Sequence, residues 1–273
     1  MFCELRLYIK GLLMLLFFVL GLSEGVNIRK HAEKYFEGEP SLYGVESREV
    51  LVAALYYPWY SKDFRGGKYI RGFLDPPQNP ALGEYNDKDS RVIRHHIAWS
   101  IHANIKVWFT SWFGPESRTD STIQSSILAS TTDFNEMGMK MAIFYETGSR
   151  LGTNMDNFSN VRSDIKYMAE HFFGHPSYLK IDGRPVFMVY LTRVLNQKRK
   201  LNDFLLIMKR TAKHAGYEDL FIIGDQAFGQ IPNSLNEEEF LFEMRRLDAI
   251  TGTDVYGSLA AKNSHATKEN FFQ

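Results

Sequence analysis

The stretch "LVAALYYPWY" (residues 51–60) passes from aliphatic residues directly into four aromatic rings grouped around Pro58. Its first half is a continuous apolar run, which is typical of a strand covered on both faces. The rings at its end have two ordinary uses: they fill the top of a core, or they form a flat surface that stacks against a ligand. The elements that follow along the chain decide which kind of sheet this strand enters.

Apolar runs of the same kind recur along the chain. They are short, rich in β-branched and aromatic residues and mostly without polar alternation, which predicts buried strands. These further runs are "IKVWFTSWF" (105–113), "KMAIFYE" (140–146), "PVFMVYL" (185–191), "LFIIGD" (220–225) and "DAITGTDVY" (248–256).

Helical patterns lie between these runs. Isoleucines recur at every fourth position over 93–101, behind Asp89 or Ser90 as the capping residue. Strands that alternate with helices predict a parallel sheet, either open or closed into a barrel. Other apolar stripes lie at 161–172, at 201–208 and at 240–244, the last behind a capping box formed by Ser234 and Glu237.

The fold class follows from the number of strand–helix units. A chain of 273 residues is long enough for a (β/α)8 TIM-type barrel, but only about six of the eight units can be recognised. An open sheet that binds a nucleotide would have a G-x-G-x-x-G turn after its first strand. Gly66 and Gly67 lack that spacing. We therefore expect an α/β fold of the (β/α)8 TIM-barrel type with about six units present, over residues 51–273.

Composition excludes several classes of function. Lysine plus arginine and aspartate plus glutamate are equal at 32 each, without the basic run that nucleic-acid binding requires. His95, His96 and His102 lack the H-E-x-x-H spacing of a zinc site, and we expect no metal and no other cofactor. A G-x-S-x-G serine elbow is absent, and Cys3 is the only cysteine.

The N-terminal segment has the layout of a targeting sequence. Basic residues precede an unbroken apolar run at 11–22, and small residues follow it. Because a membrane-spanning helix needs roughly 20 apolar residues, 1–25 is predicted to be a signal peptide, with a short Golgi membrane anchor as the alternative. Residues 26–50 are then a lead-in. Asn157 begins a glycosylation sequon, in keeping with the secretory route, either secreted or in the Golgi lumen.

Acidic and aromatic residues collect at the predicted carboxyl ends of the strands. In a parallel barrel these ends face the active site. Carboxylates among rings are typical of sugar-processing sites, because rings stack on sugars and carboxylates bind hydroxyls or transfer protons. We assign Glu146 as the catalytic candidate. The candidate substrate-binding residues are Tyr57, Trp59, Tyr60, Trp112, Arg150, Asp254 and Tyr256, and Asp225 ends the fifth strand.

Each of these residues also has a purely structural interpretation. Rings at strand ends commonly pack in the core or at its rim. Glu146 follows an apolar run, and a buried carboxylate is costly unless it is paired, so Arg150 is a candidate ion-pair partner. Asp225 can cap the turn that follows it, and Asp254 can be a turn residue. A chain with no carbohydrate role is compatible with every one of these residues.

Several segments resemble the glycoside hydrolase family 99 endo-α-mannosidases. The first-strand stretch and the H-P-x-x-Y turn are the most specific. The similar segments are "YYPWYSKDFRGGKYIRGF" (56–73), "DPPQNPALGEYNDKDSRVIRHHI" (75–97), "IKVWFTSWFGP" (105–115), "MGMKMAIFYETGSR" (137–150) and "DIKYMAEHFFGHPSYLKIDGRPVFMVY" (164–190). Together they run from about Leu51 to Tyr256.

The chain also departs from the family pattern. Phe144 stands where the family has a histidine before the third-strand glutamate, and Thr147 where it has a proline. Leu191 follows Tyr190, where the family has aspartate. The family's acid/base motif, similar to F-N-E-W-H-E, has no counterpart before the final "KENFFQ". A C-terminally truncated relative is therefore expected.

The resemblance implies retaining hydrolysis of α-mannosidic bonds within N-glycans, with a mannose-containing glycan or glycoprotein as partner. The alternative is a non-catalytic glycan-binding relative, or an inactive truncated isoform. A fragment of six strands would leave the first and sixth strands as unpaired edges, which favours aggregation. Membrane association is expected only if the N-terminal segment is retained as an anchor.

Overall fold

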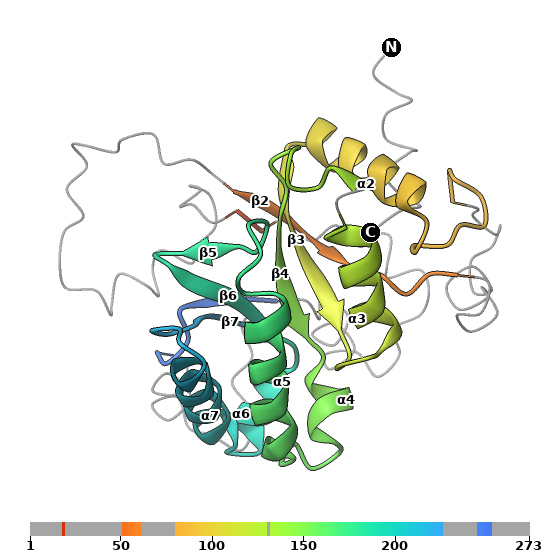
Figure 1. Ribbon diagram of the computed structural model, residues 1–273. Helices are drawn as coiled ribbons and strands as arrows, with labels where there is room; N and C mark the ends of the chain where they lie inside the picture. Colours follow the sequence, from red (N-terminus) through yellow and green to blue (C-terminus); the bar gives the residue numbers. More distant parts are fainter. Residues whose placement is uncertain (1–17, 20–50, 62–79, 130–131, 226–244, 253–273) are drawn as a thin grey trace, which may run out of the picture.

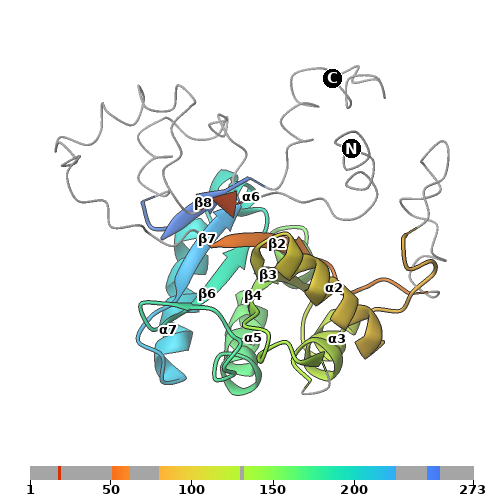
Figure 2. The ribbon, with the colours of Figure 1, turned by 90° about the horizontal axis from the view of Figure 1, so that it is seen from above.

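The computed structural model describes residues 18–19, 51–61, 80–129, 132–225 and 245–252. Within these ranges the chain forms one curved, mainly parallel sheet with helices along one face (Figures 1 and 2). The strand order is β1-β2-β3-β4-β6-β7-β8, and β5 pairs with β6 beside this path. The order follows the sequence, as in a barrel built up one strand–helix unit at a time.

All six predicted strands are present, and each is parallel to its neighbour. Their buried runs of β-branched and aromatic residues lie between two apolar layers, which explains why they lack polar alternation. They are β2 (Val52–Tyr56), β3 (Ile105–Trp112), β4 (Lys140–Tyr145), β6 (Arg184–Val189), β7 (Phe221–Asp225) and β8 (Ala249–Thr251). The expected fold class, a partial (β/α)8 barrel, is confirmed.

Two short strands were not expected. β5 (Lys180–Ile181) forms an antiparallel hairpin with the start of β6. β1 (Phe18–Val19) pairs antiparallel with Val52 and Ala53 of β2. β1 thus occupies the edge of β2 that a six-stranded fragment was expected to leave unpaired. The backbone groups at the edge of β2 account for the pairing, because an open edge accepts another strand.

The three long helices expected from apolar stripes are confirmed as α2 (Ser90–His102), α5 (Phe158–His171) and α7 (Leu201–His214). Asp89 is the N-cap of α2, where its carboxylate accepts a hydrogen bond from the backbone N–H of Arg91 at 2.9 Å. The capping box at 234–237 and its stripe lie outside the described residues.

Shorter helical segments fill the connections and were missed, because five or six residues are too few to display a periodic stripe. They are α3 (Arg118–Thr122), which continues into a π-helical turn at Ile123–Ile127, α4 (Thr147–Leu151) and α6 (Thr192–Gln197). α3, α4 and α6 each begin just after the carboxyl end of a strand. They therefore border the edge at which the candidate site lies.

The sheet has one apolar layer on each face. On the helix face, Trp108, Trp112, Tyr145 and Phe187 pack with residues of α2, α5 and α7. On the opposite, inner face a smaller cluster forms, because alternate residues of a strand point to opposite faces. This inner cluster contains Ala53, Leu55, Val107, Phe109, Ala142, Phe144, Leu179, Val186, Met188 and Ile223. Within the described ranges, no helix combines the length and the apolar composition needed to cross a bilayer.

Candidate functional site

The carboxyl ends of five parallel strands bring polar residues together on the inner face. Tyr145, Val189 and Gly224 lie at matching positions of β4, β6 and β7. The residues that follow them are Glu146, Tyr190 and Asp225, so these three stand side by side at one level of the sheet.

Tyr57 follows β2, and Ser111 lies near the end of β3. These five residues are called the inner-face cluster below.

Glu146 is a buried acid of this cluster with a raised pKa. It is only 8% exposed, and the Ser111 hydroxyl donates a hydrogen bond to its Oε1 at 2.5 Å. Burial raises the pKa of Glu146 to about 7; the bond from Ser111 opposes this change, and the charge of Asp225 adds to it. Near neutral pH both protonation states of Glu146 are therefore populated, which suits a group that binds or transfers a proton.

Asp225 is held by the segment that follows β6. Its Oδ2 accepts the backbone N–H of Leu191 at 3.2 Å, and its own N–H donates to Oγ1 of Thr192 at 2.9 Å. Leu191 has a φ of 54°, a left-handed conformation that is uncommon for leucine. The carboxylate of Asp225 thus receives a hydrogen bond from Leu191, the residue before α6. The turn after its own strand, which the sequence suggested it could cap, lies outside the described residues.

Tyr57 connects the acids to an aromatic group. Burial, followed by the charge of Glu146, raises the pKa of the Tyr57 hydroxyl, so this group remains a proton donor at neutral pH. Its ring stacks on Trp59, with centroids 4.6 Å apart, and Trp59 lies 5.6 Å from Phe113. All three rings are half-buried. Tyr57, Trp59 and Phe113 are called the aromatic platform below.

Tyr60 contacts the segment that precedes α2. Its ring packs against Tyr85 with centroids 4.5 Å apart, and its hydroxyl donates to Oε2 of Glu84 at 3.4 Å. The Tyr60 carbonyl accepts the backbone N–H of Asp87 at 3.1 Å. Tyr60 therefore joins the end of β2 to the segment that precedes α2.

The structure places Trp112, a predicted substrate-binding residue, on the helix face of the sheet. The side chain is 0% exposed and packs in the layer between sheet and helices. Its indole N–H donates to Oδ1 of Asp120 at 2.8 Å. The reason is the alternation of a strand: because Ser111 points to the inner face, Trp112 must point to the helix face.

Arg150, another predicted substrate-binding residue, forms an ion pair with Asp164. Its Nε and Nη2 donate to the carboxylate of Asp164 at 2.8 and 2.7 Å, and Asp164 is 0% exposed. The Tyr145 hydroxyl also donates to Asp164, at 2.7 Å. The expected pair of Arg150 with Glu146 is thus wrong: Arg150 joins α4 to α5, and Glu146 is hydrogen-bonded by Ser111.

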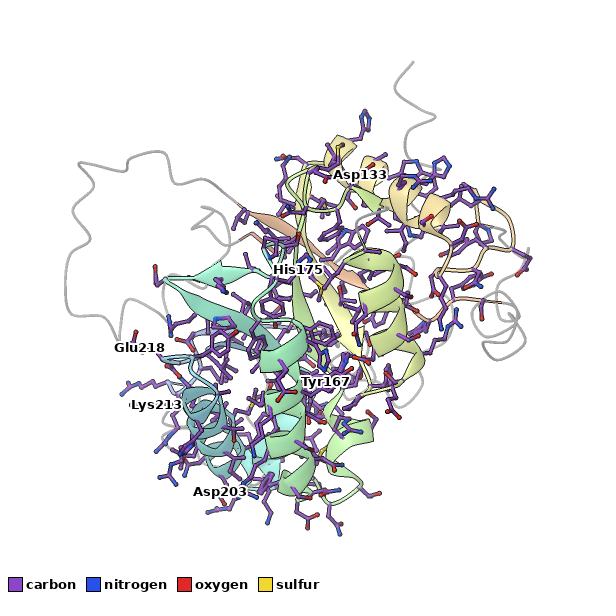
Figure 3. All side chains as sticks on the ribbon, in the orientation of Figure 1. Asp133, Tyr167, His175, Asp203, Lys213 and Glu218 are labelled. Carbon is purple, nitrogen blue, oxygen red and sulfur yellow. The ribbon has the colours of Figure 1, made fainter. Side chains whose placement is uncertain are left out.

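Asp120 forms a second hydrogen-bonded centre on the helix face. It accepts from Trp112, from the Tyr167 hydroxyl at 2.7 Å and from the side chain of Gln124 at 3.0 Å. Tyr167 of α5 is labelled in Figure 3, on the side of that helix that faces α3 and α4. This centre fixes α3 against α5 and lies on the opposite face from the inner-face cluster.

Sequence reasoning missed Ser111, Phe113 and Tyr190. The usable signal was strand parity: counting in steps of two from Glu146 or Phe109 selects the inner-face positions. Asp254 and Tyr256 lie outside the described residues, so their assignments stay predictions. In the part of the chain that the structure describes, no group of three His, Cys, Asp or Glu side chains is arranged to hold a metal ion.

A curved parallel sheet, with acids and rings where its strands end, is typical of (β/α)-barrel glycoside hydrolase-like proteins. Residues 74–226, more than half of the chain, match the model of glycosyl hydrolase family 99. This chain belongs to that family.

Individual relatives agree with this result. The chain is 26% identical over 201 residues to the mouse (Mus musculus) glycoprotein endo-alpha-1,2-mannosidase, covering 62% of this chain and 42% of that protein. The rat (Rattus norvegicus) protein of the same name is 22% identical over 231 residues, covering 73% and 48%. The chain thus spans less than half the length of these relatives.

A solved structure supports the fold. The GH99 endo-alpha-mannosidase from Bacteroides thetaiotaomicron, in complex with bis-tris-propane, is similar with a TM-score of 0.52 and 20% identity. The similarity covers 74% of this chain and 58% of that chain. At this level of identity it bears on the architecture alone.

Proposed function

We propose that this chain binds a mannose-containing glycan at the carboxyl ends of its strands, as part of a retaining endo-α-mannosidase site acting within N-glycans. Glu146 carries the proposal: a buried carboxyl whose pKa lies near neutrality, beside Asp225 and Tyr57. The adjoining aromatic platform provides flat apolar surfaces of the kind that stack on pyranose rings. Family membership and the names of the relatives support mannose as the sugar.

Hydrolysis is tested by incubating the protein with a glucosylated high-mannose glycan and analysing the products by mass. Release of an oligosaccharide by the wild-type protein, and a loss of at least tenfold in Glu146→Gln, supports the proposal. Glu218→Gln is the matched control, because Glu218 is exposed beyond the end of α7, at the outer side of the molecule (Figure 3). Equal losses in both variants would argue against a specific role of Glu146.

The second candidate is glycan binding without cleavage. It is favoured by Phe144, which stands where the family has a histidine and packs edge-on against Tyr190 with ring centroids 5.5 Å apart. An apolar ring at this position removes one polar group next to Glu146. Isothermal titration with the same glycan separates the candidates: binding without product formation supports the second, and neither binding nor product contradicts both.

The cellular route is also a proposal. A signal peptide at 1–25, or a short anchor there, would take the protein to the secretory pathway, and Asn157 would then be glycosylated. Support comes from the exposure of Asn157 and Ser159 at the start of α5, where the Ser159 hydroxyl donates to Oδ1 of Asn157 at 2.7 Å. Expression in secretory cells, followed by enzymatic removal of N-glycans, should lower the apparent mass of the wild type but not of Asn157→Gln.

A further inference from the structure

We propose that Arg118 is the positioning residue that holds the aromatic platform in its binding arrangement. The inference rests on the proposed glycan-binding function and extends it to a residue on α3. Arg118 donates from Nε to the Trp59 carbonyl at 3.1 Å and from Nη2 to the Tyr60 carbonyl at 3.2 Å. These two carbonyls belong to the segment that carries the platform residue Trp59.

The segment after β2 is held by donors from other parts of the chain. Beyond Tyr56 the chain leaves the sheet, and Pro58 has no backbone N–H to offer. A tight turn forms in which the Trp59 N–H donates to the Tyr57 carbonyl at 3.0 Å. The Trp59 and Tyr60 carbonyls both accept from Arg118, and the Tyr60 carbonyl also accepts the backbone N–H of Asp87. A partly buried carbonyl without a donor is costly, so the guanidinium of Arg118 stabilises this one conformation of the turn.

Arg118 is itself fixed in orientation. Its Nη2 lies 2.7 Å from Oδ1 of Asp87, whose side chain is only 2% exposed, and 3.0 Å from Oδ1 of Asn86. The Asp87 carboxylate neutralises the guanidinium, so Arg118 acts through its geometry and not by offering a positive charge to a ligand. A lysine has the charge but not the planar fork, and it cannot reach both carbonyls and the carboxylate together.

The same short helix holds the other side of the platform. The hydroxyl of Thr119 accepts the backbone N–H of Phe113 at 3.1 Å. Consecutive residues of α3 therefore position Trp59 and Phe113, whose rings are 5.6 Å apart. Trp59 in turn stacks on Tyr57, which lies next to Glu146 and Asp225. A shift of Arg118 would thus change both the stacking surface and the surroundings of the acids.

The test uses Arg118→Lys in the full chain, with Arg162→Lys as the control because Arg162 is an exposed residue on α5. Two quantities are measured: the affinity for a high-mannose oligosaccharide by titration calorimetry, and the near-ultraviolet circular dichroism of the aromatic residues. We expect Arg118→Lys to bind at least tenfold more weakly and to lose the same dichroic signal that Trp59→Phe loses. Its far-ultraviolet spectrum should stay that of the wild type.

Unchanged affinity and an unchanged near-ultraviolet spectrum in Arg118→Lys would overturn the proposal. If the wild type binds no mannoside, the proposed function fails, yet the spectrum still shows whether Arg118 orders the rings. Should Arg118→Lys not fold, Arg118→Gln is measured in the same two ways, because its amide can still donate to one carbonyl. A wild-type spectrum in Arg118→Gln would equally overturn the proposal.

Discussion

The guanidinium of Arg150 is bound through two nitrogens to the carboxylate of Asp164, at 2.8 and 2.7 Å, and not to Glu146, which lies four residues earlier. This pairing leaves Glu146 with a hydroxyl donor, Ser111, and with a second acid, Asp225, as the groups that act on its charge. The difference separates a structural ion pair on the helix face from a perturbed acid on the inner face.

Glu146→Gln should change the pH dependence of folding stability. Burial raises the pKa of Glu146 from 4.5 to about 7, so the folded state holds this proton more tightly than the unfolded state. The resulting contribution to the free energy of unfolding is fully present below pH 4.5 and is lost as the pH rises through 7. Because glutamine does not ionise, the variant should not lose this part of its unfolding free energy as the pH rises. Urea unfolding should find the variant more stable than the wild type at pH 8 by up to about 3 kcal/mol. At pH 5 the two should nearly agree; a constant difference across this range would contradict the buried, perturbed state.

Ser111→Ala should raise the pKa of Glu146 further. The Ser111 hydroxyl donates to the carboxylate and so favours its ionised form. Without this donor the ionised form loses stabilisation, and the pKa moves above about 7. Titration of Glu146 followed by carbon NMR on labelled protein measures the shift directly, and any activity profile that depends on Glu146 should move to higher pH. A shift to lower pH would show that Ser111 does not bond the carboxylate.

Replacement by alanine should mainly cost stability at Trp112 and mainly cost glycan binding at Trp59. Trp112 is 0% exposed and hydrogen-bonded to Asp120, so Trp112→Ala should destabilise the protein by about 3–5 kcal/mol. Trp59 is only half-buried, and Trp59→Ala should lower stability by about 1 kcal/mol while weakening glycan binding at least tenfold. Thermal unfolding and calorimetric titration of both variants provide the comparison. If a folded Trp59→Ala protein binds the glycan as tightly as the wild type, the aromatic platform is not part of the binding site.

Asp164→Asn should weaken the link between α4 and α5. The carboxylate is fully buried and accepts from Arg150 and Tyr145, and an amide cannot accept all three hydrogen bonds. We expect a loss of about 2–4 kcal/mol in unfolding free energy, toward the lower end because Arg150 keeps some contact with water. Asp203→Asn is the control, since Asp203 is exposed in the first turn of α7 (Figure 3). Equal effects of the two substitutions would contradict the assigned pair.

Gly114→Ala should disturb the same pair from the opposite side. A Cβ atom at Gly114 would lie 2.5 Å from Nη1 of Arg150, and the residue has a φ of 117° that disfavours any side chain. We expect a cost of about 1–3 kcal/mol in chemical denaturation. Gly174→Ala is the matched control: it has open space around it and no left-handed φ, and it should stay within about 1 kcal/mol of the wild type.

The agreement between sequence and structure was closest for the regular elements. Continuous apolar runs predicted all six parallel strands, and isoleucines at helical spacing behind Asp89 predicted α2 with its cap. These signals are local, because burial on two faces and a capped amphipathic turn are each encoded within about a dozen residues. The short helices that border the site have no such repeat, and neither do β1 and β5.

The sequence by itself determined that this is a strand–helix chain of the barrel type, with acids and rings where its strands end. Only the tertiary structure decided which of those side chains meet. Two neighbours in sequence, Ser111 and Trp112, point to opposite faces of β3, so one bonds Glu146 and the other enters the core. Arg150 had two acids within reach along the chain, and the packing of α4 against α5 selected Asp164. Acidic and aromatic residues at a strand end indicate a site. The pleat of the strand and the packing of distant helices determine which of these side chains lie in it.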